Sequence, residues 1–153
     1  KERIKLKELR HALPDMVNKI VRKNKMPKVG TDIAVPDDKF KEMFGFYKEK
    51  LMSSNINYVI FGHIGESHMH VNMLPETEEE FKKSRLVYMD FVKKAVSLGG
   101  TVSAEHGIGK LKHAFLEIMY GKDNLKQMAV LKKSLDPHCI LGLDNIFPKE
   151  LLR

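Results

Sequence analysis

The chain has 153 residues, of which 42% are hydrophobic, and its formal net charge is +7. This length and composition predict one globular domain or a piece of a larger protein. The single cysteine, Cys139, excludes an internal disulfide and a multi-cysteine metal site, so we expect a reducing compartment. No apolar run approaches the ~20 residues of a membrane span, and no signal peptide is visible, so the sequence predicts neither.

The basic residues gather at the start of the chain. Residues 1–28 hold ten lysines and arginines and three acidic residues, whereas the remainder carries no net charge. Such a segment can bind nucleic acid, an anionic membrane or an acidic neighbouring domain. A solvated helix face is the plainer interpretation. The lack of aromatic residues among these cations argues against binding of single-stranded nucleic acid.

The first elements in chain order are a helix and a short strand. Apolar residues recur at helical spacing over residues 9–21, and Pro14 is expected to kink or restart that helix. Residues 31–35 are rich in β-branched side chains and predict the strand.

A second helix and a hairpin follow. Asp37 or Asp38 is expected to cap a helix over residues 40–51. Residues 56–64 and 68–74 predict two strands, and the glycine-containing stretch between them favours a β-hairpin.

The second half of the chain completes the expected fold. Thr77 and Glu80 have the spacing of a capping box that begins a helix, Gly99-Gly100 ends it, and residues 101–104 predict a last strand. The order β-α-β-β-α-β is that of an α+β, ferredoxin-like split βαβ fold, in which an antiparallel sheet carries both helices on one face. Two C-terminal helices are expected near residues 110–119 and 123–134, the second ended by Pro137.

Three histidines lie within eight residues of the predicted hairpin, in the segment GHIGESHMHVN at residues 62–72. His68 and His70 are two apart on a strand and share a face, and His63 can meet His70 across the turn. Imidazole and carboxylate are usual ligands of a borderline divalent metal, so Glu105, just after the last strand, would complete such a site. The alternative is a set of unrelated core and surface histidines.

Other polar residues are candidates for binding and catalysis. His106 is the candidate general base, because an imidazole that is not held by a metal titrates near neutral pH. Arg10 can bind a carboxylate through two parallel hydrogen bonds. Composition alone favours the alternative that it is an exposed arginine on a helix. Asn72 can hydrogen-bond a substrate oxygen or simply end its strand.

The segments GHIGESHMHVN, SAEHGIGKLK and LDPHCILGLDNIFP, in this order, resemble the C-terminal domain of FAD-linked oxidoreductases. These are the relatives of D-lactate dehydrogenase, D-2-hydroxyglutarate dehydrogenase and the glycolate oxidase D subunit. The resemblance runs from about Arg10 to Phe147, which is nearly the whole chain. The family's first segment usually reads Gly-His-x-Gly-Asp-Gly-Asn-x-His-x-Asn, and here Glu66, Ser67 and His68 replace Asp-Gly-Asn.

The resemblance implies a role for each matching residue. The implied metal ligands are His63, His70 and Glu105, with zinc the expected ion. The implied substrate contacts are Arg10, Lys28 and Asn72. His106 matches the catalytic base. His68 stands where the family has an asparagine. It is expected to position the ligands without binding the metal, or to compete with them as a ligand.

The resemblance also implies that residues 1–153 are a substrate-binding cap domain, with the N-terminal FAD-binding domain absent. The whole protein is expected to oxidise a D-2-hydroxy acid of the lactate, glycolate or 2-hydroxyglutarate type to the 2-oxo acid, with hydride transfer to FAD. The fragment alone is expected to be inactive. The expected partners are the FAD-binding domain, an electron-acceptor protein and, as an open alternative, a second copy in a homodimer. The expected location is the cytoplasm or the inner face of its membrane.

Two other classes of function remain open on the sequence. A small metal-dependent hydrolase would use the same histidines and turn over without flavin. A basic nucleic-acid-binding module would bind with a steep dependence on salt. The ordered motifs favour the flavoenzyme domain, for which no nucleic-acid partner is expected.

Overall fold

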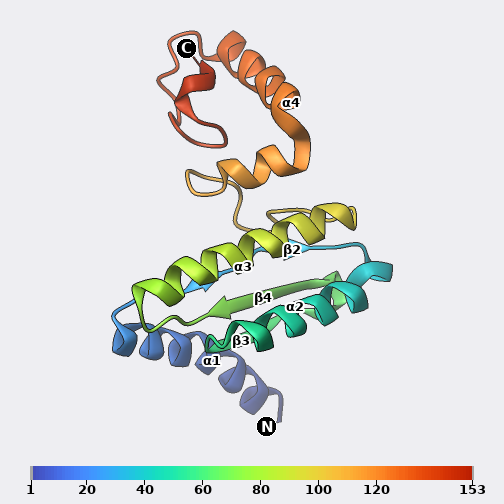
Figure 1. Ribbon diagram of the computed structural model, residues 1–153, viewed down its shortest axis with the longest axis vertical. Helices are drawn as coiled ribbons and strands as arrows, with labels where there is room; N and C mark the ends of the chain where they lie inside the picture. The colour runs from blue at the N-terminus through green and yellow to red at the C-terminus, as the bar shows by residue number, and fades with distance from the viewer. Residues whose placement is uncertain (1, 153) are drawn as a thin grey trace.

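The computed structural model describes residues 2–152 (Figure 1). Helix α1 comes first, and a four-stranded sheet with two long helices follows. A fourth long helix and a 3-10 turn end the chain. The helices and strands are α1 (Glu2–Asn24), β1 (Val29–Gly30), β2 (Ile33–Ala34), α2 (Phe40–Ser54), β3 (Tyr58–His63), β4 (His68–Met73), α3 (Glu78–Ser97) and α4 (His113–Leu135).

Strand β4 is the centre of the sheet. It pairs antiparallel with β3 along its whole length, from Tyr58 opposite Met73 to His63 opposite His68. Its other edge pairs with β1 and then with β2, and Ala34 of β2 forms an isolated bridge with Thr101. This order is that of the split βαβ arrangement, so the predicted α+β fold class and the predicted hairpin are confirmed.

The predicted strand at residues 101–104 is wrong, because only the Thr101 bridge forms. Beyond Thr101 the main chain turns around Asp32 instead of extending. The N–H of Ala104 donates to the Asp32 carbonyl, and the N–H groups of Glu105 and His106 donate to the Asp32 carboxylate.

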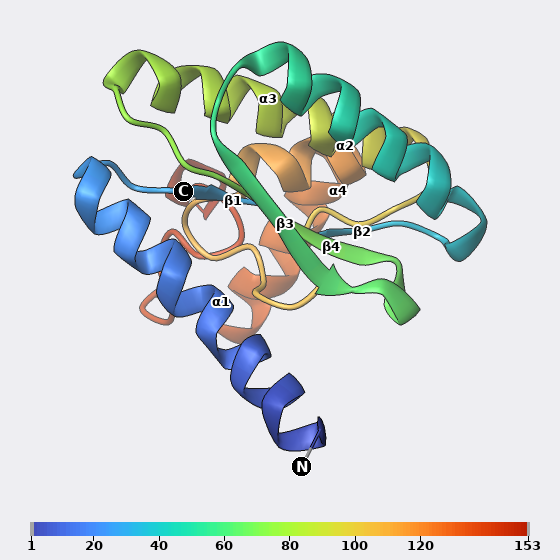
Figure 2. The same cartoon turned by 90° about the horizontal axis from the view of Figure 1, so that it is seen from below.

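Helices α2 and α3 cover one side of the sheet, and α1 lies on the other (Figure 2). The core lies between the sheet and the α2–α3 layer, where Tyr47 and Phe91 meet edge to face with ring centroids 4.8 Å apart. Residues alternate between the faces of a strand, so Met69, Val71 and Met73 of β4 turn towards this core. The polar set His68, His70 and Asn72 therefore faces the α1 side.

The ends of the two sheet-covering helices differ in how well they were predicted. Thr77 caps α3 as expected, since its hydroxyl accepts a hydrogen bond from the N–H of Glu80 at 3.1 Å. The expected aspartate cap of α2 is wrong, because the N-cap is Lys39 and no side chain caps it. Asp37 instead accepts a hydrogen bond from the Ser67 hydroxyl at 2.7 Å, which ties it to the turn of the hairpin.

Helices α1 and α4 can be compared with the helices predicted at the two ends of the chain. Helix α1 continues through Pro14, which excludes a restart and leaves the alternative, a kink, as a prediction. The carbonyl that Pro14 deprives of a partner lies on a largely exposed helix, where water can replace the lost donor. The two predicted C-terminal helices are confirmed, because α4 consists of two helical stretches on either side of Gly121, whose φ of 77° and ψ of 163° are not helical, and the second stretch ends, as predicted, before Pro137. Across residues 2–152, no helix is both long and apolar enough to cross a membrane.

Candidate metal and substrate site

The β3–β4 hairpin brings its three histidines together. His63 and His68 face each other across the strand pair, and the rings of His68 and His70 lie 4.3 Å apart between centroids. The close pairing depends on Gly62, because a Cβ there would collide with the carbonyl oxygen of His68 and with Met69 on the partner strand. The sequence thus encodes a tight hairpin whose end carries a cluster of imidazoles.

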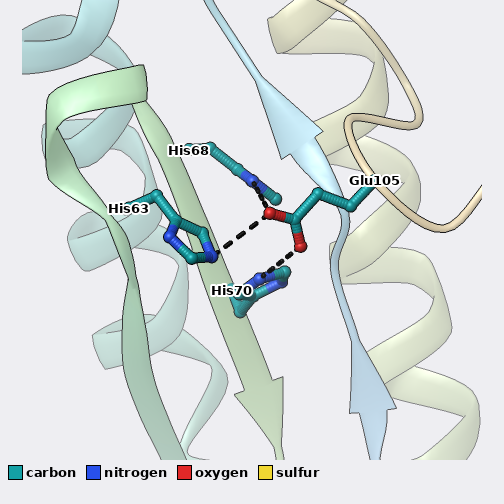
Figure 3. Close-up of side chains that lie close together, drawn as sticks. All are labelled: His63, His68, His70 and Glu105. Carbon is teal, nitrogen blue, oxygen red and sulfur yellow. Dashed lines mark ion pairs between the residues drawn. The ribbon is translucent and has the colours of Figure 1, made fainter.

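Glu105 lies at the centre of this cluster (Figure 3). Its Oε1 lies 3.2 Å from His63 Nε2 and 3.7 Å from His68 Nδ1, and its Oε2 lies 3.5 Å from His70 Nε2. One nitrogen of each histidine and one carboxylate oxygen all fall within 4.8 Å of one another. Such a set of nitrogen and oxygen atoms has the size and the chemistry of a site for a borderline divalent cation.

The tautomer of His70 suits it for ligation. Its Nδ1 lies 3.2 Å from the carbonyl oxygen of Thr31. A carbonyl oxygen only accepts, so Nδ1 must carry the hydrogen, and Nε2 then presents its lone pair towards Glu105. Orientation of a ligating imidazole by a backbone carbonyl is a common feature of metal sites.

Asp32 organises the loop that carries Glu105. It is 3% exposed and accepts hydrogen bonds from Lys112 Nζ at 2.8 Å, from Ser103 Oγ at 2.7 Å and from the N–H groups of Glu105 and His106 at 3.0 Å. Burial acts to raise the pKa of the Asp32 carboxyl, but these hydrogen bonds, led by that from Lys112, outweigh it and hold the pKa well below its usual range. Asp32 is therefore a buried anion that fixes the Glu105-His106 turn.

Asp32 is the residue of this site that the sequence-based predictions missed. One signal was present, because a charged residue in a short apolar strand is rarely buried unless it is paired. Its partners Ser103 and Lys112 are 71 and 80 residues away along the chain, so no local pattern could have named them.

Two adjoining clefts, each of about 530 Å³, open beside the cluster and share His70. One is lined by Lys28, Asn72, His70, Glu105 and His106. The other lies between α1 and the hairpin and is lined in part by Arg10, His63 and His70. The seven residues that the resemblance implies as metal ligands, substrate contacts or catalytic base thus all lie at the histidine cluster or in one of these clefts.

The predicted substrate contacts differ in their surroundings. Lys28 Nζ donates a hydrogen bond of 2.8 Å to Asn72 Oδ1, and burial lowers the pKa of Lys28 below its usual value. Arg10 and His106 are exposed, and the His106 ring lies 5.7 Å from that of His70. Burial, aided by His70, lowers the pKa of His68 against the opposing effects of Glu105 and Asp32.

Comparison with known families covers almost the whole chain. Residues 1–143 match the family described as FAD-linked oxidases, C-terminal domain. The chain belongs to this family. The segments on which the resemblance was based meet in space in this FAD-linked oxidase domain, since the hairpin histidines and Glu105 form one cluster and the ring of His106 lies 5.7 Å from that of His70.

Several relatives of this FAD-linked oxidase domain have names that state an activity. The chain is 35% identical over 117 residues to a mitochondrial D-lactate dehydrogenase (cytochrome) from Kluyveromyces lactis, a match that covers 76% of the chain and 20% of the relative. It is 30% identical over 148 residues to D-lactate dehydrogenase (cytochrome) 1 from Saccharomyces cerevisiae, with 95% and 25% covered. It is 28% identical over 121 residues to glycolate oxidase subunit GlcD from Bacillus subtilis, with 78% and 26% covered. The chain therefore spans about a fifth to a quarter of the length of these relatives.

Proposed function

We propose that this chain is the substrate- and metal-binding domain of a flavin-dependent dehydrogenase that oxidises a D-2-hydroxy acid to the 2-oxo acid. The observation that carries the proposal is the cluster of three histidines and Glu105 beside a cleft lined by Lys28, Asn72 and His106. The names of the relatives agree with it, since they include D-lactate and D-2-hydroxyglutarate dehydrogenases and a glycolate oxidase subunit. The FAD-binding domain would lie outside residues 1–153.

The donor set fits a divalent metal, with zinc the expected ion. His63 Nε2, His70 Nε2 and a Glu105 oxygen would hold it, since one ligand atom of each residue lies within 4.8 Å of the others and these two nitrogens lie 3.2 and 3.5 Å from the Glu105 carboxylate. A bound cation would supply Lewis acidity, which lowers the pKa of a coordinated hydroxyl group. FAD would accept the hydride from C2 of the substrate.

Two cationic side chains suit the carboxylate of a hydroxy acid. Lys28 is held by its hydrogen bond to Asn72, so its ammonium group is positioned within the cleft at little further entropic cost. Arg10 of α1 lines the adjoining cleft, and its planar guanidinium group can donate two parallel hydrogen bonds to the same carboxylate. The basic segment that contains both residues would thus serve an anionic substrate.

His106 suits the role of general base. Its backbone is anchored by the Asp32 carboxylate, while its ring is exposed at the edge of the cleft near His70. A ring nitrogen of His106 would take the proton of the 2-hydroxyl and release it to solvent. Glu105 is less suited to this task because it lies among three imidazoles.

Activity is the direct test of this proposal. The chain joined to the FAD-binding domain of a relative should reduce an artificial electron acceptor with D-lactate, glycolate or D-2-hydroxyglutarate, more slowly with the L enantiomers, and only after zinc loading. His106→Asn should lower kcat by about 10²–10⁴, the usual contribution of a general base. A chimera that binds FAD and zinc but oxidises none of these acids contradicts the proposal. Turnover of an ester or amide by the zinc-loaded chain alone would favour the hydrolase instead.

The remaining expectations stay predictions. They are an electron-acceptor protein, a homodimer, and a location in the cytoplasm or at the inner face of its membrane.

A further inference from the structure

His68 is the most buried member of the histidine cluster. Its side chain is 2% exposed, compared with 37% for His63 and 14% for His70. It stands at the first position of β4, opposite His63 and on the same face as His70.

The two ring nitrogens of His68 have different surroundings. Nδ1 points into the cluster and lies 3.7 Å from Glu105 Oε1 (Figure 3). Nε2 lies 3.5 Å from Asp32 Oδ1 and has no hydrogen-bond partner among the described residues. A buried polar nitrogen without a partner is uncommon and requires a physical explanation.

Asp32 supplies that explanation. An ionised carboxylate can only accept, so the hydrogen of His68 is best placed on Nε2, from which a small ring movement would make the hydrogen bond. The Nδ1 lone pair then faces Glu105. His70 repeats this arrangement, with Thr31 as the outer acceptor and Nε2 as the inner nitrogen. Both imidazoles thus present a lone pair towards the Glu105 carboxylate, each with an acceptor at its other nitrogen, as is common for metal ligands.

We propose that His68 is itself a metal ligand, through Nδ1, and that Asp32 positions it. The centre of this chain would then hold its cation with three imidazoles and one carboxylate. This inference rests on the proposed function, because it presumes a metal at His63, His70 and Glu105. Four protein ligands match the number that zinc takes in closed sites, so substrate would enter as a fifth ligand.

Metal binding by point variants tests this inference. The probe is Co²⁺, whose visible absorption reports the number and type of ligands. The chain and the variants His68→Asn, His63→Ala and His138→Asn are titrated, with His138 as an exposed control outside the cluster. We expect His138→Asn to match the wild type. We expect His68→Asn to bind at least ~10–100-fold more weakly, since removing even an outer partner of a ligand costs that much, and to give an altered spectrum.

The outcomes separate this inference from the proposed metal site. Wild-type affinity and spectrum in His68→Asn, together with loss of binding in His63→Ala, would overturn the His68 assignment and leave the site itself standing. Absence of specific Co²⁺ and Zn²⁺ binding by the wild type would overturn both.

If His68→Asn folds poorly, nuclear magnetic resonance of the wild type shows whether His68 binds the metal. In the ¹⁵N-labelled wild type, saturating Zn²⁺ should shift the His68 Nδ1 resonance to that of a metal-bound nitrogen and leave Nε2 protonated. A His68 Nδ1 resonance that Zn²⁺ leaves in place, while those of His63 and His70 move, would overturn the inference.

Discussion

Replacing Lys112 by methionine would remove the only lysine or arginine that pairs with Asp32 in the described part of the chain. The two groups are 15% and 4% exposed, and their 2.8 Å contact is therefore a buried ion pair. Breaking such a pair typically costs 3–5 kcal/mol, because the remaining charge is left in a poorly solvated place. Ser103 and two backbone N–H groups continue to donate to Asp32, so we expect a smaller loss of about 2–3 kcal/mol in the free energy of unfolding.

Urea denaturation of the metal-free chain measures this loss. The matched control is Lys110→Met, which removes the same charge from an exposed position two residues away and should change stability by no more than ~0.5 kcal/mol. Equal and small effects of the two substitutions would refute the view that Asp32 is a buried anion held by Lys112.

The dependence of the Lys112→Met effect on pH gives a further check. The pKa of Asp32 is depressed in the folded wild type, so its contribution to stability is present above the unfolded value near 4 and is lost as pH falls towards the folded value. Without Lys112 the folded pKa rises, and the folded variant binds the proton more readily. The stability difference between wild type and variant should therefore shrink between pH 7 and pH 3, and a constant difference would contradict this assignment.

Three further predictions concern the hairpin, the cap of α3 and the cleft. Gly62→Ala should cost about 1–3 kcal/mol in thermal or urea unfolding, because the new Cβ meets backbone atoms of the partner strand, whereas Gly65→Ala meets nothing within 4 Å and should be nearly neutral. Thr77→Ala should lower stability by about 0.5–2 kcal/mol through loss of the α3 cap, and Thr77→Ser should restore most of it. Lys28→Met should weaken calorimetric binding of a 2-hydroxy acid to the zinc-loaded chain by about tenfold or more, as expected for one charged hydrogen bond, and unchanged affinity would remove Lys28 from the substrate site.

The sequence predicted best what depends on short-range periodicity. The alternation along residues 68–74 predicted that His68 and His70 share one face of their strand, and the sheet confirms it, since Met69 and Val71 between and after them pack in the core. The two-residue period of a strand leaves no other arrangement once one face is buried.

Features that depend on distant partners were missed. Residues 101–104 have the composition of a strand, yet the N–H groups of Ala104, Glu105 and His106 bond to Asp32, some 70 residues earlier. Asp37 has the chemistry of a helix cap but bonds to Ser67, which the hairpin brings beside it. In both cases a tertiary hydrogen bond prevails over a local propensity.

The most direct test of the proposed metal centre is the zinc content of the purified chain after reconstitution, measured by elemental analysis beside the double variant His63→Ala/His70→Ala. We predict about one zinc per wild-type chain and almost none in the double variant, with circular dichroism showing that both are folded. Equal zinc contents in the two folded proteins would contradict a metal centre built on this hairpin.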